Sequence, residues 1–140
     1  MALITVNGKT FDSGDVTIAM FGSIDYEVTQ IAYSKSQEHT HNYALGSNDP
    51  SSYSMGKVKP EGSITLRLPS AGAIEKAAGG DILRIKPFPI IVSYINDDNE
   101  PIVDKVIAKF TKQGRDVGGD TDLKYQYDLF VLSAKFNNSL

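Results

Sequence analysis

The sequence predicts a single, mainly β domain: an antiparallel β-sandwich or partial barrel with one short α-helix. Most apolar stretches are short, rich in β-branched and aromatic residues, and bounded by polar turns, which is typical of strands. Only one segment, about 70–78, combines helix-forming residues with start and stop signals. A chain of 140 residues, 41% of them hydrophobic, is long enough to bury its own core.

Strands are predicted from the N-terminus onward. Segment 2–11 has two short apolar pieces around Asn7-Gly8, a dipeptide typical of two-residue hairpins. Segments 15–22 and 24–34 follow, and segment 62–69 alternates cleanly between apolar and polar residues. One face of this last strand holds Ile64, Leu66 and Leu68, and the other holds Ser63, Thr65 and Arg67.

The predicted helix is short and is expected to pack on the sheet. Ser70 can cap its first turn, and Gly79 with Gly80 can end it in a left-handed conformation. A second hairpin is predicted beyond it, from strands 88–95 and 102–110 around a polar turn.

The late strands carry apolar residues on both faces, which is unusual for a small antiparallel sheet. The last strand changes phase, with Leu129 and Val131 on one face and Phe130, Leu132 and Phe136 on the other. A β-bulge, cover by the helix, or burial by neighbouring subunits would each account for this pattern.

The longest polar connection, residues 37–56, contains both histidines of the chain. His39 and His41 would place both imidazoles on one strand face, a spacing that can bind zinc or iron. Because a metal needs further ligands, we interpret the pair as polar loop or strand residues and expect no metal site. A site shared between subunits stays open, as does a metal-dependent enzyme using this pair.

Enzyme motifs are not found. Asp25 and Glu27 share a strand face, but acid-base chemistry would need a pocket that separates their pKa values, so a solvated polar face is favoured. Nucleophile elbows, phosphate-binding loops and dinucleotide fingerprints are missing from the sequence, as are calcium-loop spacings. We expect neither catalysis nor a cofactor.

Charge and composition restrict the partners. The 14 basic and 17 acidic residues give a net charge of −3, which argues against tight binding of nucleic acid through its phosphates. There is no cysteine, no signal-peptide pattern and no apolar run of membrane-spanning length. These features predict a soluble protein without a membrane anchor, made in the cytosol.

The order of segments resembles the tail tube proteins of contractile-tailed bacteriophages. The likeness runs from about residue 26 to the C-terminus. It is carried by YALGSNDPSSYSMGKVKPEGSITL, by a short helix ending in AAGGDILRIKPFPIIVSYIND, and by VDKVIAKFTKQGRDVGGDTDL. Its strongest pieces are the G…P…Y…G loop leading to GSITL and the PF-I-V-Y strand with the hairpin that follows.

This resemblance implies a β-sandwich or partial barrel flanked by one helix, with six copies in a ring and rings stacked into a hollow tube. The implied partners are further copies, a tail sheath protein, baseplate or tube-initiator and tail-terminator proteins, and DNA that passes through the lumen without specific binding. The implied location is the virion tail, assembled in the host bacterial cytoplasm. Tubes of R-type bacteriocins and of type VI secretion remain alternatives. A small β-sandwich that binds a ligand is an alternative from another class.

Two sets of residues are candidates for function in such a tube. The polar strand faces are expected to line the lumen, and residues 37–56 are expected to form a long loop or hairpin that reaches a neighbouring subunit or the next ring. The lumen candidates are Asp25, Glu27, Thr29, Glu61, Ser63, Thr65 and Arg67. The subunit-contact candidates are His39, His41, Tyr43, Tyr53 and Met55.

Overall fold

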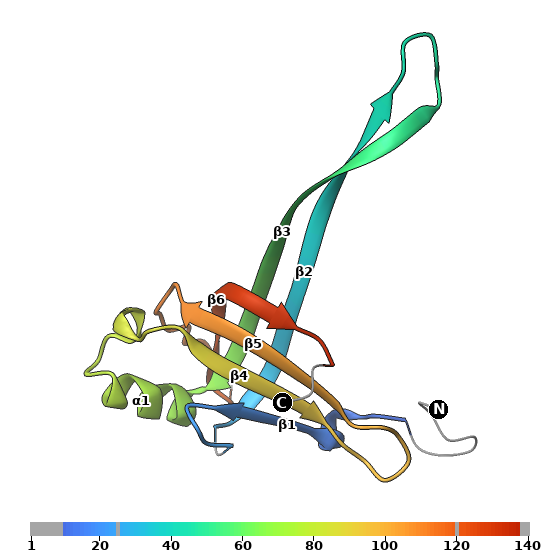
Figure 1. Ribbon diagram of the computed structural model, residues 1–140. Coiled ribbons are helices and arrows are strands. Elements are labelled where there is room, and N and C mark those ends of the chain that lie inside the picture. The colour runs from blue at the N-terminus through green and yellow to red at the C-terminus, as the bar shows by residue number, and fades with distance from the viewer. Residues whose placement is uncertain (1–9, 25, 120, 138–140) are drawn as a thin grey trace.

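A computed structural model describes residues 10–24, 26–119 and 121–137, and in these residues six strands form one antiparallel open sheet with one short α-helix (Figure 1). The strand order is β1-β4-β5-β6-β3-β2. The predicted mainly β fold class is therefore confirmed. The elements are β1 (Val16–Met20), β2 (Val28–Tyr43), β3 (Pro50–Arg67), α1 (Leu68–Ala77), β4 (Phe88–Tyr94), β5 (Ile102–Phe110) and β6 (Lys124–Lys135), with 3-10 turns at Ser13–Asp15 and Ile82–Arg84.

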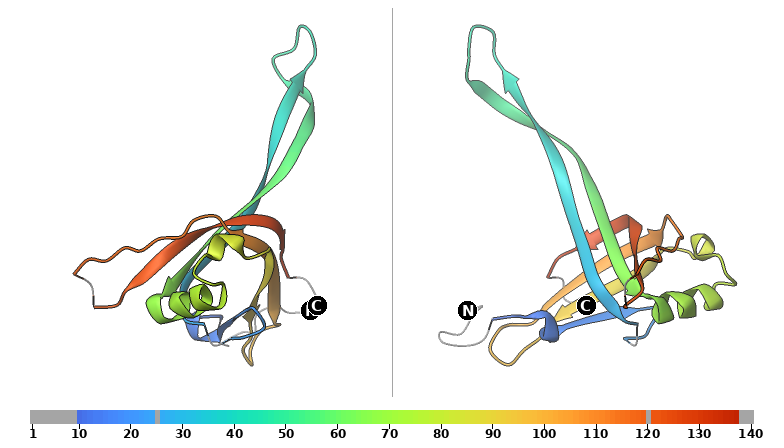
Figure 2. Two further views of the ribbon diagram at one scale, coloured as in Figure 1. Left: turned by 90° about the vertical axis from the view of Figure 1, so that its left-hand side faces the viewer. Right: turned by 180° about the vertical axis from the view of Figure 1, so that it is seen from behind.

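The sheet curls around one hydrophobic core. Val16 on β1 and Ile31 on β2 line the same hollow, so the two edge strands face each other across the opening of the sheet. Helix α1 lies at one end of the curled sheet (Figure 2) and contributes Ala71 and Ile74 to the core. The most deeply buried side chains are Tyr127, Phe110, Met20, Ile64, Leu66, Ile82, Ile90, Val92 and Val106.

Helix α1 begins earlier than expected, and Ser70 does not cap it. Arg67 occupies the N-cap position without a side-chain cap, and Pro69 lies in the first turn. Proline suits this turn because it has no N–H that needs a cap. The Ser70 hydroxyl accepts a hydrogen bond of 2.7 Å from the backbone N–H of Glu27 instead, which ties the helix to the start of β2.

The end of α1 and the second hairpin agree with the sequence. Gly79 and Gly80 have φ of 76° and 95°, the left-handed conformation expected of a helix stop. Strands β4 and β5 pair in register from Phe88 opposite Ala108 to Tyr94 opposite Ile102. The hairpin predicted around Asn7-Gly8 lies outside the described residues.

A β-bulge in β6 explains its change of phase. Ala108 on β5 pairs with Val131, whereas the preceding Ile107 pairs with Ser133, so Leu132 is the extra residue. Phe136 is therefore on the inner side, where its ring lies 5.5 Å from that of Tyr33. Its expected place on the same face as Phe130 was wrong, because the bulge inverts the alternation of side chains. Phe130 and Leu132 remain 55% and 51% exposed.

Candidate assembly surfaces

Strands β2 and β3 are much longer than the sheet they belong to. They contain 16 and 18 residues and pair from Val28 opposite Leu66 to Tyr43 opposite Pro50. Within the described residues β3 pairs with β6 only over Gly62–Arg67, so the remainder is a two-stranded ribbon. At about 3.3 Å per residue, the seven residues 37–43 extend it more than about 20 Å past the body. Figure 1 shows this projection, which we call the projecting hairpin (residues 37–58).

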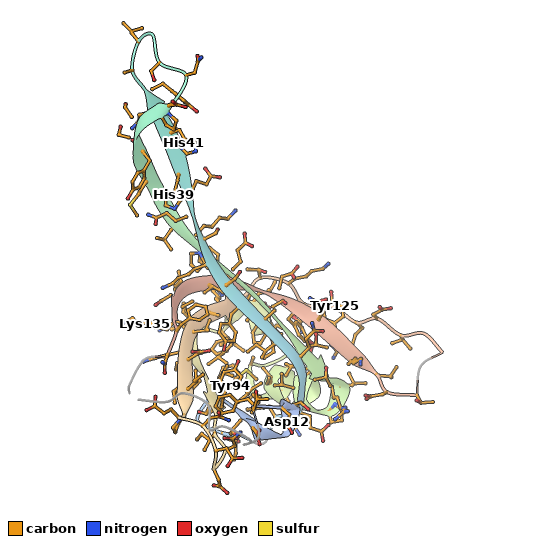
Figure 3. All side chains as sticks on the ribbon, turned by 90° about the vertical axis from the view of Figure 1, so that its right-hand side faces the viewer. Asp12, His39, His41, Tyr94, Tyr125 and Lys135 are labelled. Atoms are coloured by element: carbon orange, nitrogen blue, oxygen red, sulfur yellow. The ribbon has the colours of Figure 1, made fainter. Side chains whose placement is uncertain are left out.

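One face of the projecting hairpin is aromatic. His39 is directly opposite Met55, and His41 is directly opposite Tyr53, so these four side chains share a face. The His39 ring lies 6.1 Å from the Tyr53 ring, and the His41 ring lies 6.4 Å from the Tyr43 ring. All five predicted subunit-contact residues therefore lie together on this exposed surface. Figure 3 shows His39 and His41 on the projection, away from the body.

The opposite face of the hairpin is made of small polar side chains. The Asn42 amide donates hydrogen bonds of 3.3 Å to the Ser52 hydroxyl and 2.9 Å to the Ser54 hydroxyl. The hairpin is consequently amphipathic although it has no core of its own. A two-stranded hairpin is only marginally stable in water, and this one exposes a large aromatic face with no core beneath it.

Six of the seven lumen candidates lie on β3 or beside it, and the seventh, Asp25, is outside the described residues. Glu61, Ser63, Thr65 and Arg67 follow one another on the outer face of β3. The Thr29 hydroxyl donates to the Thr65 carbonyl oxygen at 3.5 Å, and Thr65 itself is buried, at 9% exposure. This outer face continues onto β6, because Ser63, Gln126 and Asp128 line one shallow hollow with Glu61.

Arg67 does not make this polar face basic. Its Nε lies 3.1 Å from an Asp122 carboxylate oxygen, and its Nη1 lies 3.7 Å from a Glu27 carboxylate oxygen. Both carboxylates are half exposed, so the pairs contribute little to stability. They offset the one cation among the lumen candidates. Glu61 is paired in turn with Lys59 at 3.6 Å, and the exposed Lys124 is directly opposite Arg67 on β6, so the surface around Arg67 carries charges of both signs.

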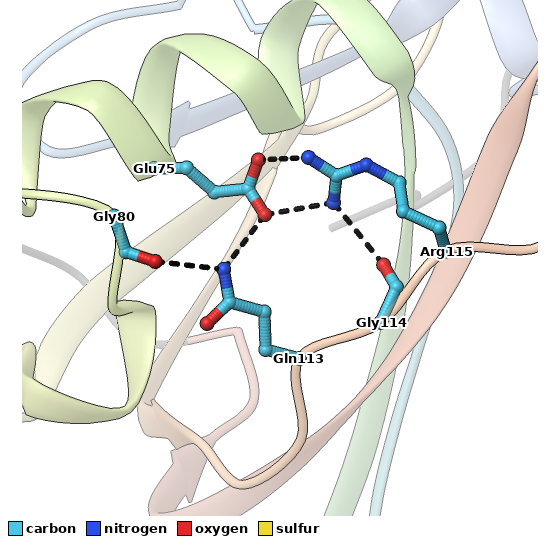
Figure 4. Close-up of polar contacts among 5 residues, drawn as sticks. All are labelled: Glu75, Gly80, Gln113, Gly114 and Arg115. Carbon is cyan, nitrogen blue, oxygen red and sulfur yellow. Dashed lines mark hydrogen bonds and ion pairs between the residues drawn. The ribbon is translucent and has the colours of Figure 1, made fainter.

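Sequence reasoning missed a buried polar cluster that fixes the loop between β5 and β6. Glu75 of α1 is 8% exposed, and one of its oxygens accepts hydrogen bonds from Arg115 at 2.7 Å and from Gln113 at 2.8 Å. The second Glu75 oxygen bonds Arg115 as well, and Gln113 also donates to the Gly80 carbonyl at 3.1 Å (Figure 4). The hydrogen bonds from Arg115 hold the pKa of Glu75 below its usual value.

A second missed cluster crosses the interior of the curled sheet. Asp104 on β5 is 5% exposed and accepts hydrogen bonds from the Tyr33 hydroxyl and, at 2.7 Å, from the backbone N–H of Asn137. Because Tyr33 donates to Asp104, the Tyr94 hydroxyl 2.8 Å away donates to Tyr33. Burial, and next the hydrogen bond to Asp104, raise the pKa of Tyr33. In the sequence this cluster is indicated only by Asp104, a charged residue at an inward-facing position between Ile102 and Val106.

We interpret both clusters as structural, because both carboxylate oxygens of Glu75 and both of Asp104 accept hydrogen bonds from within the chain. In the part of the chain that the structure describes, no three histidines, aspartates or glutamates gather closely enough to hold a metal ion. No described helix has the length and apolarity needed to cross a membrane. No protein-family model matches this sequence, and no curated protein matches it.

Proposed function

We propose that this chain is a tail tube protein, whose copies form six-membered rings that stack into a hollow tube for the ejection of DNA. The observation that carries the proposal is the projecting hairpin. Its aromatic face has no described partner within the chain, and its continuous strands prevent it from folding back onto the body. A second copy is the partner that a self-assembling tube would supply.

The edges of the sheet support the same proposal. Among the described residues β1 pairs only with β4, and β2 pairs only with β3, so one row of backbone groups on each is left for another strand. Open edges of this kind are a liability in a monomer, because they template the pairing of further chains. In a closed ring the edges of neighbouring copies pair and the liability disappears.

The outer face of β6 provides a further contact surface. Phe130 and Leu132 are both about half exposed, and Ile107 of the neighbouring strand lies next to the bulge. Large exposed apolar side chains of this kind are typical of surfaces that a protein partner covers. A ring contact would bury them.

The polar outer face of β3 is the proposed lining of the bore. A DNA conduit works best without affinity for its cargo, because each phosphate that a basic residue neutralises adds binding that slows transit. Arg67 is paired with Glu27 and Asp122, and Lys59 is paired with Glu61, so two of the cations beside the proposed lining are offset by carboxylates, which supports weak affinity for phosphates. The same lining would serve a bacteriocin or secretion tube.

Negative-stain electron microscopy of the purified protein over a concentration series tests the proposal directly. Rings or hollow tubes are expected as the concentration rises, because association depends on mass action. Tubes need an initiator in many systems, so the series is repeated with a baseplate preparation as a seed. A chain that stays monomeric in both series is not a tube protein.

Shortening the hairpin tests the observation behind the proposal. Gln37 pairs with Val58, so residues 38–57 can be replaced by an Asn-Gly turn without disturbing the register of the sheet. The shortened chain is expected to fold, as judged by its circular dichroism and thermal transition, and to form no long tubes. Normal tubes from this variant would refute the role of the hairpin.

The bore assignment can be tested by chemical labelling, because the chain has no cysteine. Glu61→Cys in an assembled tube should react with a small maleimide but not with a maleimide on a large polymer, which cannot enter the lumen. Lys112→Cys, at an exposed loop position, is the matched control and should react with both reagents if it faces outward. Equal reaction of Glu61→Cys with both reagents would place β3 outside the bore.

A further inference from the structure

The aromatic face of the projecting hairpin contains an arrangement of metal-binding atoms that a tube does not require. His39, His41 and Met55 line one open hollow together with Tyr53. His39 and His41 are two residues apart on β2, and Met55 is directly opposite His39 on β3. Two imidazoles and one thioether therefore line the same space from two strands. Figure 3 shows the two histidines on β2.

The spacing of these residues suits a single ion. Residues two apart on one strand are separated by about 6.5 Å, and residues directly opposite one another have Cβ atoms about 5 Å apart. Imidazole and thioether side chains are long enough to bring their donor atoms together from such positions. All three residues are exposed, so an ion can reach them from solvent.

The two imidazoles and the thioether determine which metal ion this site would prefer. Imidazole suits copper, zinc and nickel, whereas a thioether is a soft ligand that favours Cu⁺. Carboxylates, which calcium and magnesium prefer, are not among the residues that line this hollow. Affinity at a given nitrogen site also rises to a maximum at Cu²⁺ along the first-row divalent ions and falls again at Zn²⁺.

We propose that the projecting hairpin binds one copper ion. His39, His41 and Met55 hold Cu⁺ through two nitrogens and one sulfur. The two histidines alone hold Cu²⁺, with solvent completing its coordination. The proposal does not rest on the tube, because all three ligands lie within one chain, and binding is measured on the monomeric protein, in which this face is exposed.

Metal titration of the untagged protein tests this inference. Cu²⁺ binding is followed by electron paramagnetic resonance, and Cu⁺ binding is followed under ascorbate by competition with a coloured chelator. One equivalent of either ion is expected to bind, and Zn²⁺ is expected to bind more weakly than Cu²⁺. His41→Gln should weaken binding of both copper ions at least about tenfold, because one of two nitrogen ligands is lost.

Two further variants test whether the Met55 sulfur itself contributes to copper binding. Met55→Leu keeps the volume of the side chain but removes its sulfur, so Cu⁺ affinity should fall about tenfold while Cu²⁺ affinity changes less than about twofold. Ser54→Ala, on the opposite face of the hairpin, is the matched control and should leave both affinities unchanged. Copper binding by the His39→Gln, His41→Gln double variant at wild-type affinity would overturn the site, as would tighter binding of Zn²⁺ than of Cu²⁺. All variants exchange exposed side chains, so their folding is not at risk.

Discussion

The body and the projecting hairpin are built from the same kind of strand but use their apolar side chains in opposite ways. In the body, Ile90 and Val92 of β4 are completely buried, and their neighbours on both sides cover them. On the hairpin, Tyr53 is 64% exposed and Met55 is 59% exposed, and the Leu45 side chain at its tip is fully exposed. The body is therefore stabilised by side chains that the chain itself buries, whereas the apolar side chains of the hairpin stay exposed.

Because of this difference, folding stability and association can be altered by separate sets of substitutions. Substitutions in the body should change the free energy of unfolding, because they act on buried area. Substitutions on the hairpin should change association and leave unfolding almost unaltered. Both expectations can be tested with matched pairs of variants.

The largest difference is expected between Ile90→Ala and Leu45→Ala, which remove comparable side chains from the body and the hairpin tip. Ile90→Ala should lower the free energy of unfolding by about 2–5 kcal/mol, because it leaves a cavity in a fully buried site. Leu45→Ala should change it by less than about 0.5 kcal/mol. Urea denaturation measures both, and similar losses in the two variants would contradict the division between body and hairpin.

A smaller effect is expected from the buried cluster around Asp104. Tyr33→Phe removes one of the two described donors to a carboxylate that is 5% exposed, and should cost about 1.5–3 kcal/mol of unfolding free energy. Tyr53→Phe on the hairpin is the matched control and should cost almost nothing. An equal cost in both variants would mean that the cluster does not stabilise the body.

Tyr33 also predicts a dependence on alkaline pH. Because burial raises its pKa above the ordinary value of 10.0, the folded state holds this proton more tightly than the unfolded state. Its contribution to stability is complete below pH 10.0 and is lost progressively above that pH. Denaturation midpoints of the wild type should fall more steeply above pH 10.0 than those of Tyr33→Phe, and parallel curves would exclude this contribution.

The ion pair of Glu75 with Arg115 should have a smaller effect that disappears in acid. The pKa of Glu75 is lowered in the folded state, so its contribution is present above the ordinary value of 4.5 and is lost as the pH falls through the lowered folded value. At pH 7 Glu75→Gln should lower the free energy of unfolding by about 1–2 kcal/mol. This figure allows for solvent screening of the ion pair, because the Arg115 side chain is 45% exposed. Glu38→Gln, on the hairpin, is the control. If Glu75→Gln lowered the free energy of unfolding equally in strong acid, the contribution of Glu75 would not be ionic.

The smallest effect on unfolding is expected from Tyr53→Ser with Met55→Ser, which removes two of the five side chains of the aromatic face. Both side chains are exposed, so the unfolding free energy should change by less than about 0.5 kcal/mol. The same variant should fail to form long tubes under the conditions in which the wild type assembles. Ser54→Ala, on the polar face, is the control and should assemble normally. If the double variant lost unfolding free energy but still formed long tubes, the hairpin would contribute to folding and not to assembly.

Much of the fold could be predicted because its signals are local. The alternation of Ile64 and Leu66 with polar neighbours marked a strand, and the polar turn between β4 and β5 marked a hairpin, since side chains two apart share a face. Gly79 and Gly80 marked the end of the helix because glycine adopts positive φ without strain. The shared face of His39 and His41 followed from the same strand periodicity.

What only the tertiary structure decided depends on residues far apart in the sequence. Tyr33 meets Asp104 across 71 positions, and Arg115 meets Glu75 across 40, because the sheet curls and brings distant elements together. Ser70 bonds to Glu27 rather than capping its own helix for the same reason. Backbone preferences and periodicity act between neighbours along the chain and are therefore visible in its sequence. The partner of a buried polar group is chosen by the curvature and pairing of the whole sheet, which neighbouring residues do not encode.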